Sequence, residues 1–256
     1  MKRLYPLLIL AVAVLSGFTL KAQNKVSVAV AANMQFTMAQ LKTEFEKETG
    51  ITLQVTVGAS GSLCAQVMED APFDVFVSAD MNYADELYKK GFATNAPEVY
   101  AYGSLVLWTM SPGIRPLADL KFLSEPAIKK IAVANPKTAP YGVAAEEALK
   151  YYKVYDQVKD KLVYGENIGQ TQQFIASQAA DIGFIAKSLV LADEMKGKGN
   201  WIDVDSKAYQ PIAQGAVILK HGQQTNNTSA QKFYRFLYSK EARSIFKKYG
   251  YIVKEK

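Results

Sequence analysis

The sequence predicts an α/β fold in which strand–helix repeats are divided between two lobes. Short apolar runs alternate with helical patterns along the chain, as in sheets of parallel strands flanked by helices. Two longer apolar runs, at residues 102–110 and 212–219, bracket the second series of repeats. About 234 residues remain after the N-terminal segment considered below, which is enough for one large domain or two lobes.

The first half of the chain repeats a strand followed by a helix three times. Met38, Leu41 and Phe45 recur at the three- to four-residue spacing of a buried helix face, and Gly50 then ends the pattern. The predicted strands are residues 26–30, 51–57 and 73–77, and the predicted helices are 36–49, 62–70 and 83–90. This order predicts a mostly parallel sheet.

The second half contains another such series. Its predicted strands are residues 131–135, 163–165 and 181–185, and its predicted helices are 142–152 and 169–178, with one or two more over 229–249. The two long strands suggest that the chain leaves the first lobe, builds a second and returns, so that two crossings form a hinge. A single continuous sheet is the alternative. The two-lobe interpretation assigns residues 23–103 and 209–256 to lobe 1 and 104–208 to lobe 2.

The N-terminus has the parts of a secretory signal peptide. A basic start at Lys2 and Arg3 precedes an apolar run at residues 7–18 and a small residue, Ala22. That run is about a dozen residues, shorter than the roughly 20 that cross a bilayer. We therefore expect residues 1–22 to be removed near Ala22 and the protein to be periplasmic.

Composition excludes several classes of function. The net charge of +6 falls to +3 once residues 1–22 are removed, because they hold three basic residues and no acidic one. Such a mild charge does not indicate a nucleic-acid partner. The only cysteine, Cys64, lies among apolar residues and is expected to be a buried, inert thiol. No His, Cys and Asp cluster has metal-ligand spacing, so no metal-cation site is expected.

A secreted hydrolase that uses Ser60 or Ser104 is a competing function. Such an enzyme needs a base, and the only histidine is His221, in a polar stretch with no glycine-bracketed serine. We expect no catalytic residues. A cell-surface interaction domain is a further alternative, for which no exposed aromatic or low-complexity stretch argues.

Four strand-to-helix breaks, at which a predicted strand ends and a predicted helix begins, have the same arrangement. Asn33 follows the first strand and Ser60 the second, while Tyr141 and Ile168 precede helices in the second half. The first N–H groups of a helix have no partner within it, and the helix dipole leaves them partly positive. Four such ends that converge from two lobes would form an anion site.

Each break also has a simpler interpretation. Polar residues such as Asn33 and Ser60 are ordinary helix caps, and Tyr141 and Ile168 could be core side chains. However, no Lys or Arg lies within residues 29–33 or 56–63, so an anion here would be held by neutral donors. Donors alone favour a fully ionised oxyanion, because a protonated one would find no acceptor for its O–H. Selection among such ions would then depend on size.

At these residues the chain resembles the periplasmic molybdate-binding proteins of ABC transporters. The similarity rests on Val-Ala-Ala-Asn at 30–33, Gly-Ala-Ser-Gly-Ser-Leu at 58–63, the segment 71–80, Asn-Pro-Lys-Thr-Ala-Pro-Tyr-Gly at 135–142, Ile-Gly-Phe-Ile at 182–185 and the C-terminal segment 246–251. It spans the mature chain in the family's order.

This resemblance implies a two-lobed, hinge-bending protein that binds molybdate, and also tungstate, and delivers it to a membrane permease. The positions that match the family's ligand contacts are Asn33, Ser60, Tyr141 and Ile168, with further backbone contacts possible at Ala32 and Gly61. Asn33 is expected to donate through its amide, Ser60 through its hydroxyl and N–H, and Tyr141 and Ile168 mainly through backbone N–H. We expect a monomer without a cofactor.

Three further positions bear on the candidate site. Ala186 stands where some relatives have a ligand tyrosine, which leaves the number of contacts open. Asp74 and Asp80 are expected to act as caps or hydrogen-bonding groups, because carboxylates would repel an oxyanion. A binding protein for another oxyanion, such as sulfate, or for a small organic anion remains an alternative within the same class.

Overall fold

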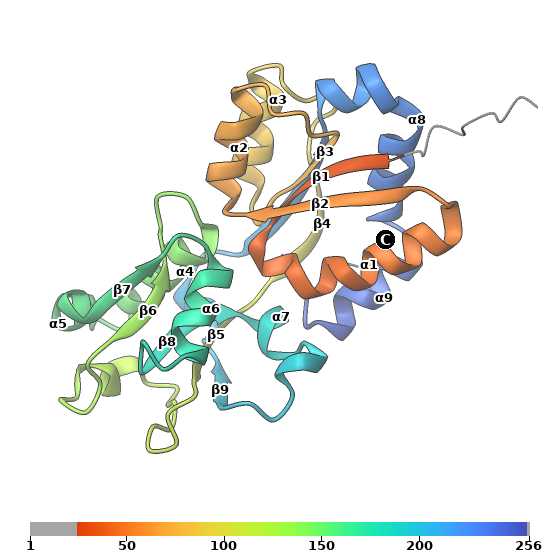
Figure 1. Ribbon diagram of the computed structural model, residues 1–256. Helices are drawn as coiled ribbons and strands as arrows, with labels where there is room; N and C mark the ends of the chain where they lie inside the picture. Colours follow the sequence, from red (N-terminus) through yellow and green to blue (C-terminus); the bar gives the residue numbers. More distant parts are fainter. Residues whose placement is uncertain (1–24, 255–256) are drawn as a thin grey trace, which may run out of the picture.

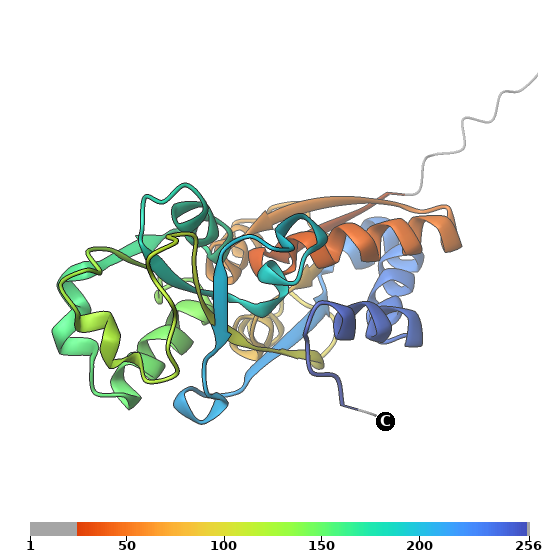
Figure 2. The same ribbon diagram turned by 90° about the horizontal axis from the view of Figure 1, so that it is seen from below.

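The computed structural model describes residues 25–254, so the predicted signal peptide at residues 1–22 and its cleavage lie outside the described residues. The described chain forms two five-stranded sheets with flanking helices, arranged as two lobes side by side (Figures 1 and 2). The two-lobed α/β prediction is confirmed. Within residues 25–254, no helix has the length and apolar character needed to span a membrane.

The sheet of lobe 1 has the strand order β2-β1-β3-β10-β4. Its strands are β1 (Lys25–Ala31), β2 (Thr52–Gly58), β3 (Val75–Val77), β4 (Glu98–Gly103) and β10 (Ile212–Ile218). Its helices are α1 (Gln35–Thr49), α2 (Ser60–Met68), α3 (Met81–Lys89), α8 (Lys220–Phe236) and α9 (Lys240–Lys248), with a 3-10 turn η1 (Ala32–Met34).

The sheet of lobe 2 has the order β7-β6-β8-β5-β9. Its strands are β5 (Leu105–Thr109), β6 (Ile131–Ala134), β7 (Leu162–Gly165), β8 (Ile182–Ala186) and β9 (Asn200–Asp203). Its helices are α4 (Pro140–Tyr151), α5 (Tyr155–Val158), α6 (Ile168–Ala176) and α7 (Lys187–Val190), with 3-10 turns η2 (Leu120–Ser124), η3 (Lys159–Lys161), η4 (Asp193–Met195) and η5 (Ser206–Ala208).

Both sheets are mixed, with one reversed strand each. In lobe 1, β1 runs parallel to β2 and β3, while β10 is antiparallel to both β3 and β4. In lobe 2, β6 runs parallel to β7 and β8, while β5 is antiparallel to both β8 and β9. The reversed strand is in each case the one that has just arrived from the other lobe.

The predicted long strand at residues 102–110 is in fact two strands in two sheets. β4 ends at Gly103 in lobe 1, and β5 begins at Leu105 in lobe 2. The apolar run does not reveal this break, because Gly103 and Leu105, on either side of it, are both buried. The return crossing lies between β9 and β10, and its Tyr209 hydroxyl accepts a hydrogen bond from the Leu105 N–H at 3.0 Å. The two crossings are therefore joined as a hinge.

Helices cover both faces of the lobe 1 sheet, as strand alternation requires. Ala29, Phe76 and Val217 face one side and pack with residues of α2 and α3. Their neighbours along each strand face the other side and pack with residues of α1, α8 and α9. Helix α8 begins at Lys220, nine residues before the predicted start. Its first turns are polar and hold a non-helical residue, Asn226, so periodicity missed them.

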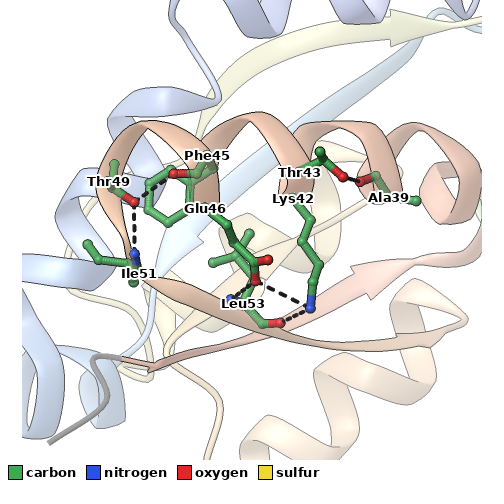
Figure 3. Close-up of polar contacts among 8 residues, drawn as sticks. All are labelled: Ala39, Lys42, Thr43, Phe45, Glu46, Thr49, Ile51 and Leu53. Carbon is green, nitrogen blue, oxygen red and sulfur yellow. Dashed lines mark hydrogen bonds and ion pairs between the residues drawn. The ribbon is translucent and has the colours of Figure 1, made fainter.

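The outer edge of β2 is covered by side chains of α1 (Figure 3). The Glu46 Oε1 accepts a hydrogen bond from the Leu53 N–H at 2.7 Å, and the Lys42 Nζ donates to the Leu53 carbonyl at 2.5 Å. Leu53 pairs with Val26 on β1, so its outward N–H and C=O would otherwise lie unpaired at a sheet edge. These contacts fix the strand that leads to Ser60.

Glu46→Ala should therefore destabilise lobe 1 without altering the fold. We expect the free energy of unfolding in urea to fall by about 1 kcal/mol, because a half-buried hydrogen bond to a charged acceptor is lost. Glu48→Ala is the matched control, since the Glu48 side chain is on the same helix and forms no hydrogen bond within residues 25–254. Equal unfolding midpoints for the two variants would contradict this role of Glu46.

Candidate functional site

The four predicted strand-to-helix breaks meet at one cavity between the lobes. Residues from both lobes border it: Ala31, Ala32, Asn33, Gly58, Ala59, Ser60 and Ala79 from lobe 1, and Ala139, Pro140, Tyr141, Asn167 and Ile168 from lobe 2. The predicted residues Asn33, Ser60, Tyr141 and Ile168 are all present, together with Ala32. The structure thus brings all four breaks together.

Strand direction explains this convergence. The turn η1 begins at Ala32 after β1, and α2 begins at Ser60 after β2. In lobe 2, α4 begins at Pro140 after β6, and α6 begins at Ile168 after β7. Parallel strands end at the same edge of a sheet, so the helices that follow them start side by side. The first N–H groups of these helices are donors without intrahelical partners.

The simpler interpretation, that Asn33 and Ser60 are helix caps, does not describe this structure. The cap positions of η1 and α2 are Ala31 and Ala59, and neither forms a side-chain cap hydrogen bond in the described chain. Asn33 and Ser60 lie inside their helices and are buried. Buried polar side chains that do not cap a helix need another reason to be at the cavity.

The Ser60 hydroxyl is oriented by a bond that it accepts. The Ala79 N–H, just after β3, donates to Ser60 Oγ at 3.0 Å. A hydroxyl can accept a hydrogen bond and also donate its own proton. Ser60 Oγ accepts in this contact, so its proton is not used there. Ser60 can therefore present its O–H to an acceptor in the cavity.

The Asn33 side chain differs from the prediction. Its Nδ2 donates to Gln214 Oε1 at 3.0 Å and to the Tyr251 hydroxyl at 2.9 Å. Both amide protons are thereby used within the protein, so in this arrangement Asn33 does not offer them to a ligand. Its Oδ1 is buried and has no hydrogen-bond partner among the described residues. The reason is tertiary, because Gln214 and Tyr251 are distant in sequence.

The Tyr141 side chain extends into the hinge. Its ring is buried, and its hydroxyl accepts a hydrogen bond from Gln214 Nε2 at 3.1 Å. A Cβ atom at Gly103 would lie 2.0 Å from this hydroxyl and 2.5 Å from Gln214 Nε2, so only glycine fits there. The backbone of Tyr141, at the start of α4, therefore borders the cavity, while its side chain extends into the hinge.

Helix α6 has a cap that the sequence analysis did not single out. The Asn167 Oδ1 accepts from the Gly169 N–H at 2.9 Å and from the Gln170 N–H at 3.0 Å. The Thr171 N–H donates to the Asn167 carbonyl at 3.0 Å, so the Ile168 N–H is the donor at this helix start that has no partner among the described residues, and Ile168 borders the cavity. An Asn just before a helical pattern is a recognised start signal and could have been noted.

Charge is absent from the cavity wall. Among the described residues that border it, none is Asp, Glu, Lys, Arg or His. Asp80 lies next to Ala79, but its Oδ1 accepts from the Tyr83 N–H at 3.2 Å and from Ser78 Oγ at 3.1 Å. Burial raises the pKa of the Asp80 carboxyl above its ordinary value. Asp80 is the N-cap of α3, as predicted.

Asp74 also has the predicted structural role. Its Oδ2 accepts from the Ser27 N–H at 2.8 Å, and its Oδ1 lies 2.9 Å from His221 Nδ1. This pair links β1 to the start of α8. His221 borders a different cavity from the one at the helix starts, so it is not placed to act as a base for Ser60.

Two hydrogen bonds join lobe 1 to lobe 2 beside the cavity. The Gly61 N–H donates to the Thr138 carbonyl at 2.9 Å, and the Tyr83 hydroxyl donates to the Lys137 carbonyl at 3.1 Å. Gly61 was predicted as a possible backbone contact, but its N–H is used here and it lies outside the cavity wall. Ala186, at the end of β8, is buried and also lies outside this wall.

The small size of the cavity suits a compact ligand. About 10 Å³ is open to the centre of a water-sized sphere, which is roughly the room that one such sphere needs. Most residues of the wall are small, so backbone groups can approach a ligand closely. Donors on several sides of a small cavity match an oxyanion of a few atoms better than an organic ligand.

The chain has clear relatives. The model of the family described as bacterial extracellular solute-binding protein matches residues 26–252. The chain is 39% identical over 230 residues to a molybdate-binding protein of Azotobacter vinelandii, covering 89% of each. It is 36% identical over 244 residues to a molybdate-binding protein of Rhodobacter capsulatus, covering 94% of each. The solved structure of a periplasmic molybdate-binding protein from Azotobacter vinelandii has a TM-score of 0.84 and 33% identity, covering 90% of this chain and 100% of that one.

The buried tyrosines beneath the cavity should make the fold sensitive to alkali. Burial raises the pKa of the Tyr251 hydroxyl from 10.0 to about 12. The folded state then holds this proton more tightly than the unfolded state, so the associated stability is present below about pH 10 and is lost as the pH rises toward 12. We expect the free energy of unfolding to fall over this range. In Tyr251→Phe the fall should be smaller, as measured by urea denaturation; an equal fall would contradict this role for Tyr251.

Proposed function

This chain belongs to the family of bacterial extracellular solute-binding proteins, and we propose that it captures molybdate between its lobes for the membrane permease of an ABC transporter. One observation carries the proposal. Four helix starts, two from each lobe, meet at a cavity bordered by no charged side chain within residues 25–254. Similarity over most of the chain to proteins named for molybdate supports this ion as the ligand.

The physics of the cavity favours a fully ionised tetrahedral ion. Backbone N–H groups and the Ser60 hydroxyl are donors, and each oxygen of such an ion accepts. A protonated ion would bring a donor that needs an acceptor, at a cost of about 1–3 kcal/mol if it finds none. Discrimination among ions of equal charge then falls to size, so we propose that tungstate binds as well and that sulfate binds less tightly.

The positions of the helix starts support a specific set of contacts. Ser60 donates through its hydroxyl, and Tyr141 and Ile168 donate through the backbone N–H at the starts of α4 and α6. Ala32 and Asn33 contribute N–H groups from η1.

The family consists of binding proteins, so the chain is not an enzyme. The hydrolase alternative also lacks a base at Ser60, because His221 is paired with Asp74 and borders another cavity. We further propose that the protein acts in the periplasm as a monomer, after removal of residues 1–22 near Ala22. Lobe bounds of 23–103, 104–208 and 209–256 are part of this proposal.

Calorimetric titration of the mature protein tests the ligand. We expect heat of binding with molybdate and tungstate and little with sulfate or phosphate at equal concentration, because the relatives of this chain are named for molybdate and because a phosphate ion carries a proton that finds no acceptor among donors. Heat with sulfate or phosphate alone would overturn molybdate as the ligand.

Removal of the Ser60 hydroxyl tests whether this residue belongs to the binding site. Ser60→Ala should weaken molybdate binding by about 1–3 kcal/mol, because a buried donor to a charged acceptor is lost. Ser62→Ala is the matched control, since Ser62 lies on the same helix and outside the cavity wall, and its side chain forms no hydrogen bond in the described chain. Equal dissociation constants for the two variants would remove Ser60 from the site.

A further inference from the structure

A residue of the cavity wall carries a buried oxygen without a partner. The Asn33 side chain is 1% exposed and borders the cavity, yet its Oδ1 accepts no hydrogen bond from any described residue. An unsatisfied buried acceptor is destabilising, because it has lost its hydrogen bonds to water. An amide oxygen could not bind an oxyanion, because its partial negative charge would meet the full negative charge of the ion. This atom therefore needs an explanation.

Gln214 is placed to control that oxygen. It is fully buried on the hinge strand β10, where the pairing with β4 shifts between Gln214 and Gly215. Such bulges re-aim side chains. Its Oε1 accepts from Asn33 of lobe 1, and its Nε2 donates to Tyr141 of lobe 2. One amide thus touches one cavity residue from each lobe.

The hydrogen bonds around Gln214 run in one donor-to-acceptor order, from Asn33 through Gln214 to Tyr141. Asn33 Nδ2 donates to Gln214 Oε1, and Gln214 Nε2 donates onward to the Tyr141 hydroxyl. The Tyr100 hydroxyl lies 2.8 Å from Gln214 Oε1 and 3.0 Å from the Ser78 carbonyl, and it can donate to either. Tyr251 accepts from Asn33 Nδ2 and donates to the Asn33 carbonyl.

The same groups can also form these hydrogen bonds with donors and acceptors exchanged. If both amides turn over, Gln214 Nε2 donates to Asn33 Oδ1 and to the Tyr100 hydroxyl, whose own proton goes to the Ser78 carbonyl. The Tyr141 hydroxyl then donates to Gln214 Oε1. The oxygen and nitrogen of an amide exchange places in this turn, so every contact keeps a donor and an acceptor.

The other partners of Asn33 allow this turn. Tyr251 can donate to Asn33 Oδ1, because the Asn33 carbonyl keeps its bond from Ser188 Oγ at 2.7 Å. Burial raises the pKa values of the Tyr100 and Tyr141 hydroxyls well above the ordinary value, so both retain the protons that the exchange uses. The orphaned Oδ1 is then replaced by Nδ2, which has two protons to donate.

We propose that Gln214 is the positioning residue of the site and that a bound oxyanion turns the Asn33 and Gln214 amides over together. The inference rests on the proposed function. Asn33 thereby becomes a side-chain donor only when the ion is present, and the ion is coupled through Gln214 to Tyr141 in the opposite lobe. Gln214 acts through Asn33 and makes no contact with the ion itself.

Nuclear Overhauser effects from the Gln214 side-chain amide report its direction. In protein labelled with 15N, we expect cross-peaks from the Gln214 Nε2 protons to the Tyr141 ring without molybdate. At saturation these should be replaced by cross-peaks to the Tyr100 ring. Cross-peaks to Tyr141 that persist at saturation, or cross-peaks to Tyr100 already present without the ion, would overturn the inference.

A variant adds an affinity readout. Gln214→Met keeps the side-chain length but cannot orient Asn33, so we expect the dissociation constant for molybdate to rise about tenfold, the equivalent of one lost buried hydrogen bond. Thr109→Val is the control for losing a buried hydrogen bond elsewhere, since the Thr109 hydroxyl donates to the Asp181 carbonyl in lobe 2. Equal affinities for these two variants would contradict the role of Gln214.

These experiments distinguish failure of the proposed function from failure of the inference about Gln214. Wild-type protein that gives no heat with molybdate would overturn the proposed function and this inference together. Wild-type binding with unchanged Gln214 cross-peaks would overturn this inference alone. The cross-peak measurement uses wild-type protein, so it decides the matter even if Gln214→Met does not fold.

Discussion

An anion loses its hydration when two lobes close around it, and its oxygens must then find donors in the protein. The wall of this cavity carries no charged side chain in the part of the chain that the structure describes, so the donors that it offers to an ion are backbone N–H groups and neutral side chains. One sheet presents its helix starts along a single edge and can meet an ion from one side only. A second sheet that faces the first completes the enclosure. The two-lobed architecture, with β1 and β2 opposite β6 and β7, follows from this requirement.

The hinge and the site share residues, and this links movement to binding. Both crossings pass beside the cavity: Gly103 leaves room for the Tyr141 hydroxyl, and Gln214 stands on the returning strand β10. The Tyr209 hydroxyl ties the two crossings through the Leu105 N–H. A site built on strands that cross between lobes is therefore sensitive to their relative position. Buried polar networks of this kind are stable only when each member has a partner, which is why the orphaned Asn33 Oδ1 carries information.

The sequence predicted the parts of the site that depend on local pattern. Apolar runs that stop at small residues located Asn33, Ser60, Tyr141 and Ile168, and all four border one cavity. It missed the break at Ser104, because residues on both sides are equally apolar, and the start of α8, because its first turns are polar. It also gave no indication that Gln214 and Tyr251 would contact Asn33. These lie 181 and 218 residues from Asn33, and no periodicity connects positions so far apart.

The sequence by itself determined the alternation of strands and helices, the uncharged character of the breaks and the positions at which helices could meet a ligand. These are local properties, fixed by side-chain period, small residues and the absence of Lys and Arg. Only the tertiary structure decided how those positions are used. It commits the Gly61 N–H to Thr138 and the Asn33 amide to Gln214 and Tyr251, and it leaves the Ser60 proton available. The physical reason is that a hydrogen-bond donor is free or engaged according to which distant segment lies beside it, and that depends on how the two lobes are placed.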